Sequence, residues 1–456
     1  MRCNRRFQGL ILLIVLMIMT ACEQSSEARI EVQMEAQVLS NEVHYTKVAL
    51  QEDFQRLEQS ILSEHPKIYT DIDALTATLK SQYTLIEEGM TQREFLQILA
   101  PIVSKLNCGH TTISYSEDYQ QKLSLEALYF PLPVHFIEGR AYVVQNGMDP
   151  RVPLGAELLS INGRSIQAIR QELFSFLSAD GTNETHKDFL LNGWFRYYFY
   201  NFIDNSKTYE LAFQTEDKRE TKQLVVKGAT NDDMTAINKP LYQENSEPYT
   251  SRFEEKYAVL SMYSFYPYGG YTITDFKAFI DSFFLDVKEK HIDQVILDVR
   301  ENGGGDPYIT SHLFSYLAKV SQPYFTQDAI DYYDGLKSNV PLAQNHYSGK
   351  LYTLMSGGSF SSTGHLLALL KHQNIGTFIG EESGASYACT DASYDILLPQ
   401  TQIHYRTSTL AWAVDVNGLS PGRGIMPDIN VIQPIADYLN NRDTVMNAAV
   451  SLVEGQ

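Results

Sequence analysis

The sequence is poor in cysteine and in positive charge, and it has no long apolar run after its first residues. Only 4 of the 456 residues are cysteine, and no Cys/His spacing resembles a zinc site. Lysine and arginine number 36 against 55 acidic residues, a formal charge of -19. Nucleic acid is therefore not expected as a partner, because phosphate binding needs a cationic face. Beyond the N-terminus no stretch is long and apolar enough to cross a membrane.

Two common motifs are also missing. The run DVRENGGGDP (298–307) has three glycines after a buried strand, but it lacks the Gly-Lys-Ser/Thr of a phosphate loop and the glycine spacing of a dinucleotide site. The lipase elbow G-x-S-x-G is excluded for Ser361, since Ser359 and Thr363 stand where glycines are needed.

The N-terminus is typical of an exported lipoprotein. Residues 1–21 carry arginines, then an apolar run, then small residues before Cys22, which predicts a signal peptide and a lipidated Cys22. A retained membrane anchor is the weaker interpretation, because the run is short and a polar segment follows at once. Residues 22–48 are expected to be a polar tether. The protein would then be lipid-anchored in the cell envelope, on the periplasmic face of a bacterial membrane or at the cell surface.

The hydrophobic pattern of the rest of the chain changes twice. Apolar residues recur at helical spacing in residues 49–118, which predicts a helical N-terminal domain. Short β-like runs and an Asn-Gly turn signal follow in 119–230, a block that resembles a PDZ-type module, with a plain scaffolding β domain as the alternative. After a polar connection, residues 250–456 alternate strands and helices, and the run QVILDV indicates a strand covered on both faces.

The main candidate for a functional site is the stretch 351–384, LYTLMSGGSFSSTGHLLALLKHQNIGTFIGEESG. It reads as a strand, a small-residue turn, a helix starting near Ser361 and a second strand. Such a turn places a hydroxyl and unbonded amides at the positive end of a helix, the geometry of an acyl-transfer nucleophile. The simpler alternative is an N-cap cluster, since serine and threonine favour helix starts for structural reasons.

Four motifs in order carry a family resemblance: ILDVRENGGG, SGGSFSSTGHLLALL, IGEESG and GRGIMPDINV, after an upstream GHT. Together they resemble the C-terminal processing peptidases and tricorn-type serine proteases. The resemblance implies a multidomain α/β protein with a ClpP/crotonase-like catalytic core. It also implies that Ser361 is the nucleophile, with Ser359 as the less favoured register.

The general base is inferred from a position at which this sequence differs from one branch of that family. The processing branch uses a lysine in the loop after the second strand, where this sequence has Ser386. The tricorn branch uses an upstream histidine, and His110 in GHT matches it, so the resemblance implies a Ser361–His110 pair within about 4 Å. His365, on a neighbouring face of the helix that Ser361 heads, is the competing base.

The remaining site residues are less determined. The resemblance implies an oxyanion hole of backbone amides from Gly303 or Gly304 and from Ser362. The family's orienting glutamate is missing before GIMPD, which leaves three substitutes open: Asp391, Glu381 and Asp415. Asp298 and Asp428 are expected to be structural. Cys108 and Cys389 flank the supposed site, so we also consider a disulfide between them.

The sequence thus predicts a serine endopeptidase that cleaves peptides or unfolded protein segments without metal or cofactor. Two alternatives stay open: a non-catalytic envelope lipoprotein that binds peptides or glycans on the same fold, and a small-ester or amide hydrolase.

Overall fold

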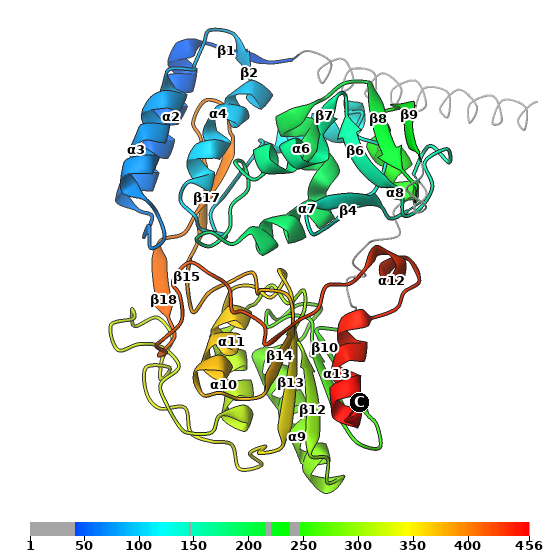
Figure 1. The fold of residues 1–456 in the computed structure, drawn as a ribbon. Helices are drawn as coiled ribbons and strands as arrows, with labels where there is room; N and C mark the ends of the chain where they lie inside the picture. Colours follow the sequence, from blue (N-terminus) through cyan, green and yellow to red (C-terminus); the bar gives the residue numbers. More distant parts are fainter. Residues whose placement is uncertain (1–41, 146, 216–219, 238–246, 456) are drawn as a thin grey trace, which may run out of the picture.

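The computed structural model describes residues 42–145, 147–215, 220–237 and 247–455. The predicted signal peptide, Cys22 and most of the tether lie outside these residues. Figure 1 shows two halves: helices and an antiparallel sheet from the first half of the chain, and a mainly parallel sheet with its helices from the second. None of the helices in the described ranges is both long and apolar enough to span a bilayer.

The second half is built on a six-stranded sheet of order β10-β11-β12-β13-β14-β19. Its strands are β10 (Tyr249–Phe253), β11 (Ala258–Met262), β12 (Gln294–Asp298), β13 (Lys350–Met355), β14 (Thr377–Gly380) and β19 (Ile429–Asn430). Only β10 runs antiparallel to its neighbour. The strands β11 and β13 are buried almost throughout, as their unbroken apolar runs predict for a sheet covered on both faces.

Helices cover both faces of this sheet. One face packs against α9 (Ile273–Glu289), α10 (Pro307–Leu317) and α11 (Ser362–His372). The other face packs against α13 (Thr444–Glu454), which follows the short α12 (Ile435–Leu439). The carboxyl ends of β12 and β13 therefore open onto one edge, where ligands of open α/β sheets bind.

The first half holds helices and a separate antiparallel sheet. The helices are α2 (Lys47–Ser63), α3 (Ile72–Tyr83), α4 (Gln92–Ser104) and α5 (Glu117–Glu126), with the short strands β1 (His44–Tyr45), β2 (Met90–Thr91) and β3 (Thr112–Ser114). Side chains of Thr46, Asp71 and Thr91 cap the first three of these helices.

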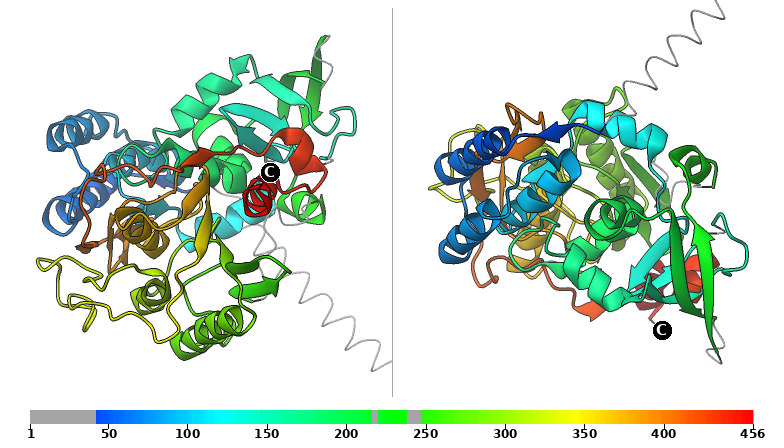
Figure 2. Two further views of the ribbon diagram at one scale, coloured as in Figure 1. Left: turned by 60° about the horizontal axis from the view of Figure 1, so that its bottom comes forward. Right: turned by 90° about the horizontal axis from the view of Figure 1, so that it is seen from above.

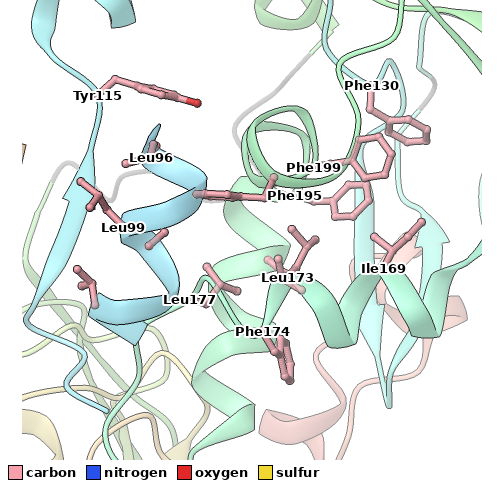
Figure 3. Packing of buried hydrophobic residues seen from close by; sticks show 14 of the residues in the cluster. Leu96, Leu99, Tyr115, Phe130, Ile169, Leu173, Phe174, Leu177, Phe195 and Phe199 are labelled. Carbon is pink, nitrogen blue, oxygen red and sulfur yellow. The ribbon is translucent and has the colours of Figure 1, made fainter. Parts of the chain in front are cut away.

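The antiparallel sheet has the order β4-β5-β6-β8-β9, with β7 paired to β6. Its elements are β4 (Val134–Ile137), β5 (Arg140–Val143), β6 (Glu157–Ile161), β7 (Arg164–Ser165), β8 (Thr208–Gln214) and β9 (Thr221–Lys227). Helices α6 (Ile166–Leu173), α7 (Glu184–Tyr198), the π-helical turn η1 (Phe199–Ile203) and α8 (Asn231–Ile237) accompany it. Leu96 and Leu99 of α4 lie in one core with Leu173 and Phe195 of this sheet's helices (Figure 3), so the hydrophobic core crosses residue 118, where we predicted a domain boundary.

A hairpin from the second half joins the first. Strands β16 (Tyr394–Leu397) and β17 (His404–Thr407) extend away from the pair β15 (Ala388–Asp391) and β18 (Leu410–Ala413), and β17 pairs antiparallel with β3. Figures 1 and 2 both show this orange hairpin beside the blue helices. The sequence did not indicate this crossing, which fixes the loop before β3 against the second half of the chain.

Candidate active site

Ser361 lies in the turn that connects β13 to α11. It is the residue before the helix, and its backbone has φ 55° and ψ -127°, a conformation that non-glycine residues rarely adopt. Its side chain makes no capping bond, so the capping alternative does not describe this serine. The turn is held by Ser359, which is fully buried and donates its hydroxyl proton to the Val299 carbonyl at 2.8 Å. Of the two registers, Ser359 is therefore a structural residue, and Ser361 carries a helix-start hydroxyl that caps no amide of the helix.

His110 meets Ser361 from the other half of the chain. The distance from its Nε2 to Ser361 Oγ is 3.0 Å, although 251 residues separate the two. The loop that carries His110 begins after α4 and runs into β3, which the hairpin strand β17 clamps. The imidazole also stacks on the ring of Phe360, with centroids 4.6 Å apart. The structure thus brings together the two side chains that the sequence predicted to meet.

Burial sets the protonation of this histidine. Desolvation lowers the pKa of His110 to about 4, and the negative charge of Asp391 opposes that shift in part. At neutral pH the imidazole is uncharged, so Nε2 can accept the Ser361 proton.

The competing base is placed differently. The Nε2 of His365 lies 3.3 Å from Sγ of Cys389, and the ring packs edge-on against Tyr324 and Phe325. Burial lowers the pKa of His365 to about 3. His365 therefore supports the wall of the site beside the thiol, while His110 contacts the serine.

The expected disulfide between Cys108 and Cys389 is wrong. Both cysteines are free and buried. Sγ of Cys108 lies 2.7 Å from Oγ1 of Thr390, and Cys389 faces His365, so the two thiols point to different partners. Burial raises the pKa of both thiols, with the Ser361 hydroxyl partly opposing the shift at Cys389. Both stay protonated at neutral pH and are poor nucleophiles.

Asn302 holds the glycine loop in place, although no sequence motif predicted a role for it. Its Oδ1 accepts the Gly304 amide at 2.9 Å and the Thr363 hydroxyl at 2.9 Å, and its Nδ2 donates to the Met262 carbonyl at 2.9 Å. The side chain is completely buried. The only sequence signal was a polar residue between a buried strand and the glycine run, and an asparagine there can bond both flanking turns.

This bond changes the expected oxyanion hole. Because the Gly304 amide already donates to Asn302, it is not available to a substrate in this structure. Within the described residues, no hydrogen bond is seen for the amides of Gly303 or Ser362. Gly304 instead provides space: with φ 93°, a Cβ there would lie 2.6 Å from Cβ of Ser361.

None of the three suggested acids bonds to His110. Its Nδ1 is buried and has no partner among the residues that the structure describes. Asp391 acts on the imidazole through its charge, but its Oδ1 accepts the hydroxyl of Ser393 at 3.1 Å. Burial raises the pKa of Glu381, and the charges of Asp188 and Glu138 add to that shift.

The third suggested acid and the two structural aspartates are placed as follows. The backbone of Asp415 donates to the Tyr324 carbonyl, and no interaction of its side chain with His110 is seen in the described part of the chain. Asp298 pairs with Arg300 at 2.6 Å, and Asp428 accepts the Phe378 amide at 2.9 Å and pairs with Lys371. The structural role expected for Asp298 and Asp428 is therefore confirmed.

A further acid lies under the His110 loop. Asp180 is 2% exposed, and its Oδ1 accepts the Gly109 amide at 2.8 Å. Its Oδ2 is buried without a partner in the described ranges, and burial raises its pKa to about 7. Asp180 was not among the predicted residues, because no sequence motif links it to GHT. Across the described ranges, no group of three or more histidine, cysteine, aspartate or glutamate side chains could hold a metal ion.

Comparisons with known proteins agree with this architecture. Residues 256–431 match the model of peptidase family S41. The crystal structure of mature CPAF is 14% identical, covers 89% of this chain and 96% of that chain, and superposes with a TM-score of 0.64. Mature CPAF complexed with lactacystin is 16% identical, with coverage of 90% and 99% and a TM-score of 0.61. At these identities the likeness concerns the fold, and no curated relative matches the sequence.

The family match spans the part of the chain that contains the glycine loop, the serine turn and the strand after it. The solved structures share the arrangement of a mixed, mainly parallel sheet with an additional helical region. Residues 256–431, in the α/β half, therefore form a peptidase family S41 domain, and the protein is a hydrolase of the serine peptidase class.

Proposed function

We propose that this protein is an endopeptidase that cleaves peptides or unfolded protein segments through an acyl-enzyme on Ser361, with His110 as general base. The observation that carries the proposal is the 3.0 Å contact between His110 Nε2 and Ser361 Oγ at the start of α11. A neutral imidazole in hydrogen-bond contact with an uncapped helix-start serine is the arrangement that nucleophilic acyl transfer needs.

The chemistry follows from the geometry. Nε2 of His110 takes the proton of Ser361 Oγ as that oxygen attacks the scissile carbonyl carbon. The negative charge moves to the carbonyl oxygen, and the amides of Gly303 and Ser362 are the proposed donors to it. Each such donor is worth about 3 kcal/mol of barrier. The imidazolium then gives its proton to the leaving amine, and a water molecule activated by His110 hydrolyses the ester.

We also propose that the α/β half has a ClpP/crotonase-like core and that the antiparallel sheet is PDZ-like. One contact bears on how that sheet is used. The side-chain amide of Asn192 on α7 accepts the Phe136 N–H at 2.6 Å and donates to the Phe136 carbonyl at 3.3 Å. Phe136 lies on the edge strand β4, so a peptide that adds there as a strand must first displace Asn192. This favours a structural or gating role for the sheet.

Hydrolysis assays test the proposed function. Wild-type protein should cleave fragments of casein faster than short-chain esters, and Ser361→Ala and His110→Ala should each lower kcat at least a thousandfold. His135→Gln is the matched histidine control, because His135 stacks on Tyr438 in another part of the molecule. Ester cleavage without peptide cleavage would favour a small-ester hydrolase. Peptide binding with no turnover of either substrate would favour a binding protein.

We further propose that the mature chain is held in the cell envelope by lipid on Cys22. The support is the order of arginines, apolar run and small residues before Cys22. Labelled fatty acid should be incorporated by the wild type, and Cys22→Ser should lose the label and leave the membrane fraction. A wild type without label would contradict the anchor but not the peptidase.

A further inference from the structure

Two complementary buried atoms at the active site have no partner in the described part of the chain. One is Nδ1 of His110, and the other is Oδ2 of Asp180. When Nε2 of His110 accepts the serine proton, the neutral ring must carry its own hydrogen on Nδ1, which makes that atom a donor. A carboxylate oxygen is an acceptor. Buried polar groups are rarely left unpaired, because the cost is about 1–3 kcal/mol each.

The contacts of Gly109 place both groups in one site. Its amide donates to Asp180 Oδ1 at 2.8 Å, and it is the residue directly before His110. A Cβ on Gly109 would lie 2.5 Å from the Phe360 ring and 3.4 Å from Asp180 Oδ1. Phe360 is the ring on which the His110 imidazole stacks. The carboxylate therefore lies at the base of the loop that presents the imidazole to Ser361.

The segment that carries Asp180 is fixed on both sides. The Gly181 amide donates to the Asn107 carbonyl at 2.9 Å, and the Thr182 amide donates to the Gly422 carbonyl at 2.9 Å. Nδ2 of Asn183 donates to the Ser383 carbonyl at 2.6 Å. A carboxylate on such a segment is pre-positioned, so little conformational freedom is lost when it accepts a hydrogen bond.

The surroundings of the two groups contain few competing charges. Burial raises the pKa of Tyr69, Cys108 and Cys389, and the charge of Asp180 adds to the shift of each, so all three are neutral at pH 7. The groups that act on His110 are Asp391, His186, Arg406 and His365. Of these only Asp391 is an acid, and Ser393 already donates to it at 3.1 Å.

We propose that Asp180 is the positioning carboxylate of His110, with Oδ1 holding the loop through the Gly109 amide and Oδ2 accepting the Nδ1 proton. The second contact is not made in the structure, so in the proposal it forms by rotation of a side chain or through one water molecule. The serine proton stays on Nε2 until it passes to the leaving amine, and Asp180 remains a carboxylate that stabilises the imidazolium. This inference rests on the proposed function and assigns Asp180 in place of the acid missing before GIMPD.

Asp180→Asn tests the proposal in the full chain, because asparagine keeps the acceptor for Gly109 and removes the charge. We expect kcat to fall at least tenfold with KM changed less than twofold. In the wild type kcat/KM should fall as pH drops below about 7, where Asp180 takes up a proton, and in Asp180→Asn the fall should move toward pH 4, the pKa of His110. The proposal would be overturned if Asp180→Asn kept a kcat within twofold of wild type, or if its kcat/KM fell at the same pH as in the wild type.

Asp53→Asn is the matched control. Asp53 is also fully buried and accepts backbone amides, those of Gln400 and Thr401, but it lies on α2 and bonds the turn of the hairpin. Its loss should lower stability and leave kcat within twofold. An equal fall of kcat in both variants would show that Asp180 acts only by holding the fold.

A measurement independent of turnover separates this inference from the proposed function. Nitrogen NMR of ¹⁵N-histidine protein, assigned with His110→Gln, reports the tautomer and the pKa of His110 directly. We expect the Nδ1–H tautomer in the wild type and a mixture of tautomers in Asp180→Asn. If the wild type hydrolyses nothing, the proposed function fails, while an unchanged tautomer in Asp180→Asn would overturn the role of Asp180.

Discussion

The ring of Phe360 stacks on the imidazole of His110, with centroids 4.6 Å and planes 30° apart. Phe360 directly precedes Ser361, so the turn that presents the Ser361 hydroxyl also packs against the ring of His110. Phe360 also stacks on His186, with centroids 4.5 Å apart.

Replacing this ring should impair catalysis more than folding. Stacked aromatic pairs are worth about 0.5–1.5 kcal/mol beyond their burial, and about 1.4 kcal/mol in the barrier is a tenfold change in rate. We expect Phe360→Leu to lower kcat about tenfold with a small change in KM. Phe284→Leu, a buried ring of the α9 core, is the control that should alter stability alone. Equal kcat in the two variants would show that the stacking does not orient His110.

The space over Gly304 should be essential. A Cβ there would lie 2.6 Å from Cβ of Ser361 and 2.9 Å from the Ser362 nitrogen, so Gly304→Ala must displace the serine turn. A misplacement of about 1 Å can cost a hundredfold in rate, and we expect at least that loss in kcat. Gly163→Ala pays a similar backbone cost at φ 75° but meets no atom within 4 Å, so it should keep normal kcat. Normal kcat in Gly304→Ala would contradict the proposed geometry.

Asp53 should stabilise the junction between the two halves. Its carboxylate accepts the amides of Gln400 and Thr401 at 2.8 and 2.7 Å, and the Thr401 hydroxyl at 2.6 Å. Asp53→Ala leaves these buried donors unpaired, and each costs about 1–3 kcal/mol. We expect the free energy of unfolding to drop by about 2–4 kcal/mol in a urea titration, with the smaller loss in Asp53→Asn. An unchanged midpoint would mean that the hairpin is held by its apolar side chains alone.

Buried histidines should make the protein sensitive to acid. Burial lowers the pKa of five of them from 6.5 to about 4 or below: His65, His110, His135, His186 and His365. Between pH 6.5 and 4 the unfolded chain binds more protons at these sites than the folded chain, so stability falls as pH falls through that window. Six buried or partly buried acids act in the opposite direction: burial raises the pKa values of Asp180 and Glu301 to about 7, and it also raises those of Asp53, Asp188, Asp306 and Glu381. We expect the five histidines to outweigh them, because only the first two acids carry a shift as large as those of the histidines.

The measurement is the urea midpoint at pH 7, 6 and 5. We expect the midpoint to fall as the pH is lowered. The free energy of unfolding should drop by up to about 1.4 kcal/mol per pH unit for each histidine. His135→Gln should show a shallower decrease, since one of the titrating groups is gone. A midpoint that rises toward pH 5 would contradict the direction of these shifts.

The sequence predicted best the features that depend on residues close together in the chain, namely the buried strands and the serine turn. The runs around β11, β12 and β13 are apolar without alternation, and a strand buried on both faces requires that. The serine turn was recognisable because small residues must stand where a strand turns sharply into a helix. The pairing of Ser361 with His110 came from the missing lysine at Ser386 together with the family resemblance.

Contacts set by tertiary structure could not be read in this way. The hairpin 394–407 looks like any other pair of short strands, and only the fold shows that it pairs with β3. Asp180 comes from a polar segment without a motif, and only the fold shows that it accepts the Gly109 amide beside His110. The disulfide hypothesis failed because proximity to one site does not make two thiols face each other.

The central claim is that Ser361 is the nucleophile and that His110 activates it. The most direct measurement is labelling with a fluorophosphonate probe, followed by tryptic mass mapping of the peptide between Lys350 and Lys371, with fragmentation to locate the adduct. The account predicts one adduct, on Ser361, in the wild type, and none in Ser361→Ala or His110→Ala. A wild type that stays unlabelled, or an adduct on Ser359 or Ser362 in its place, would contradict it.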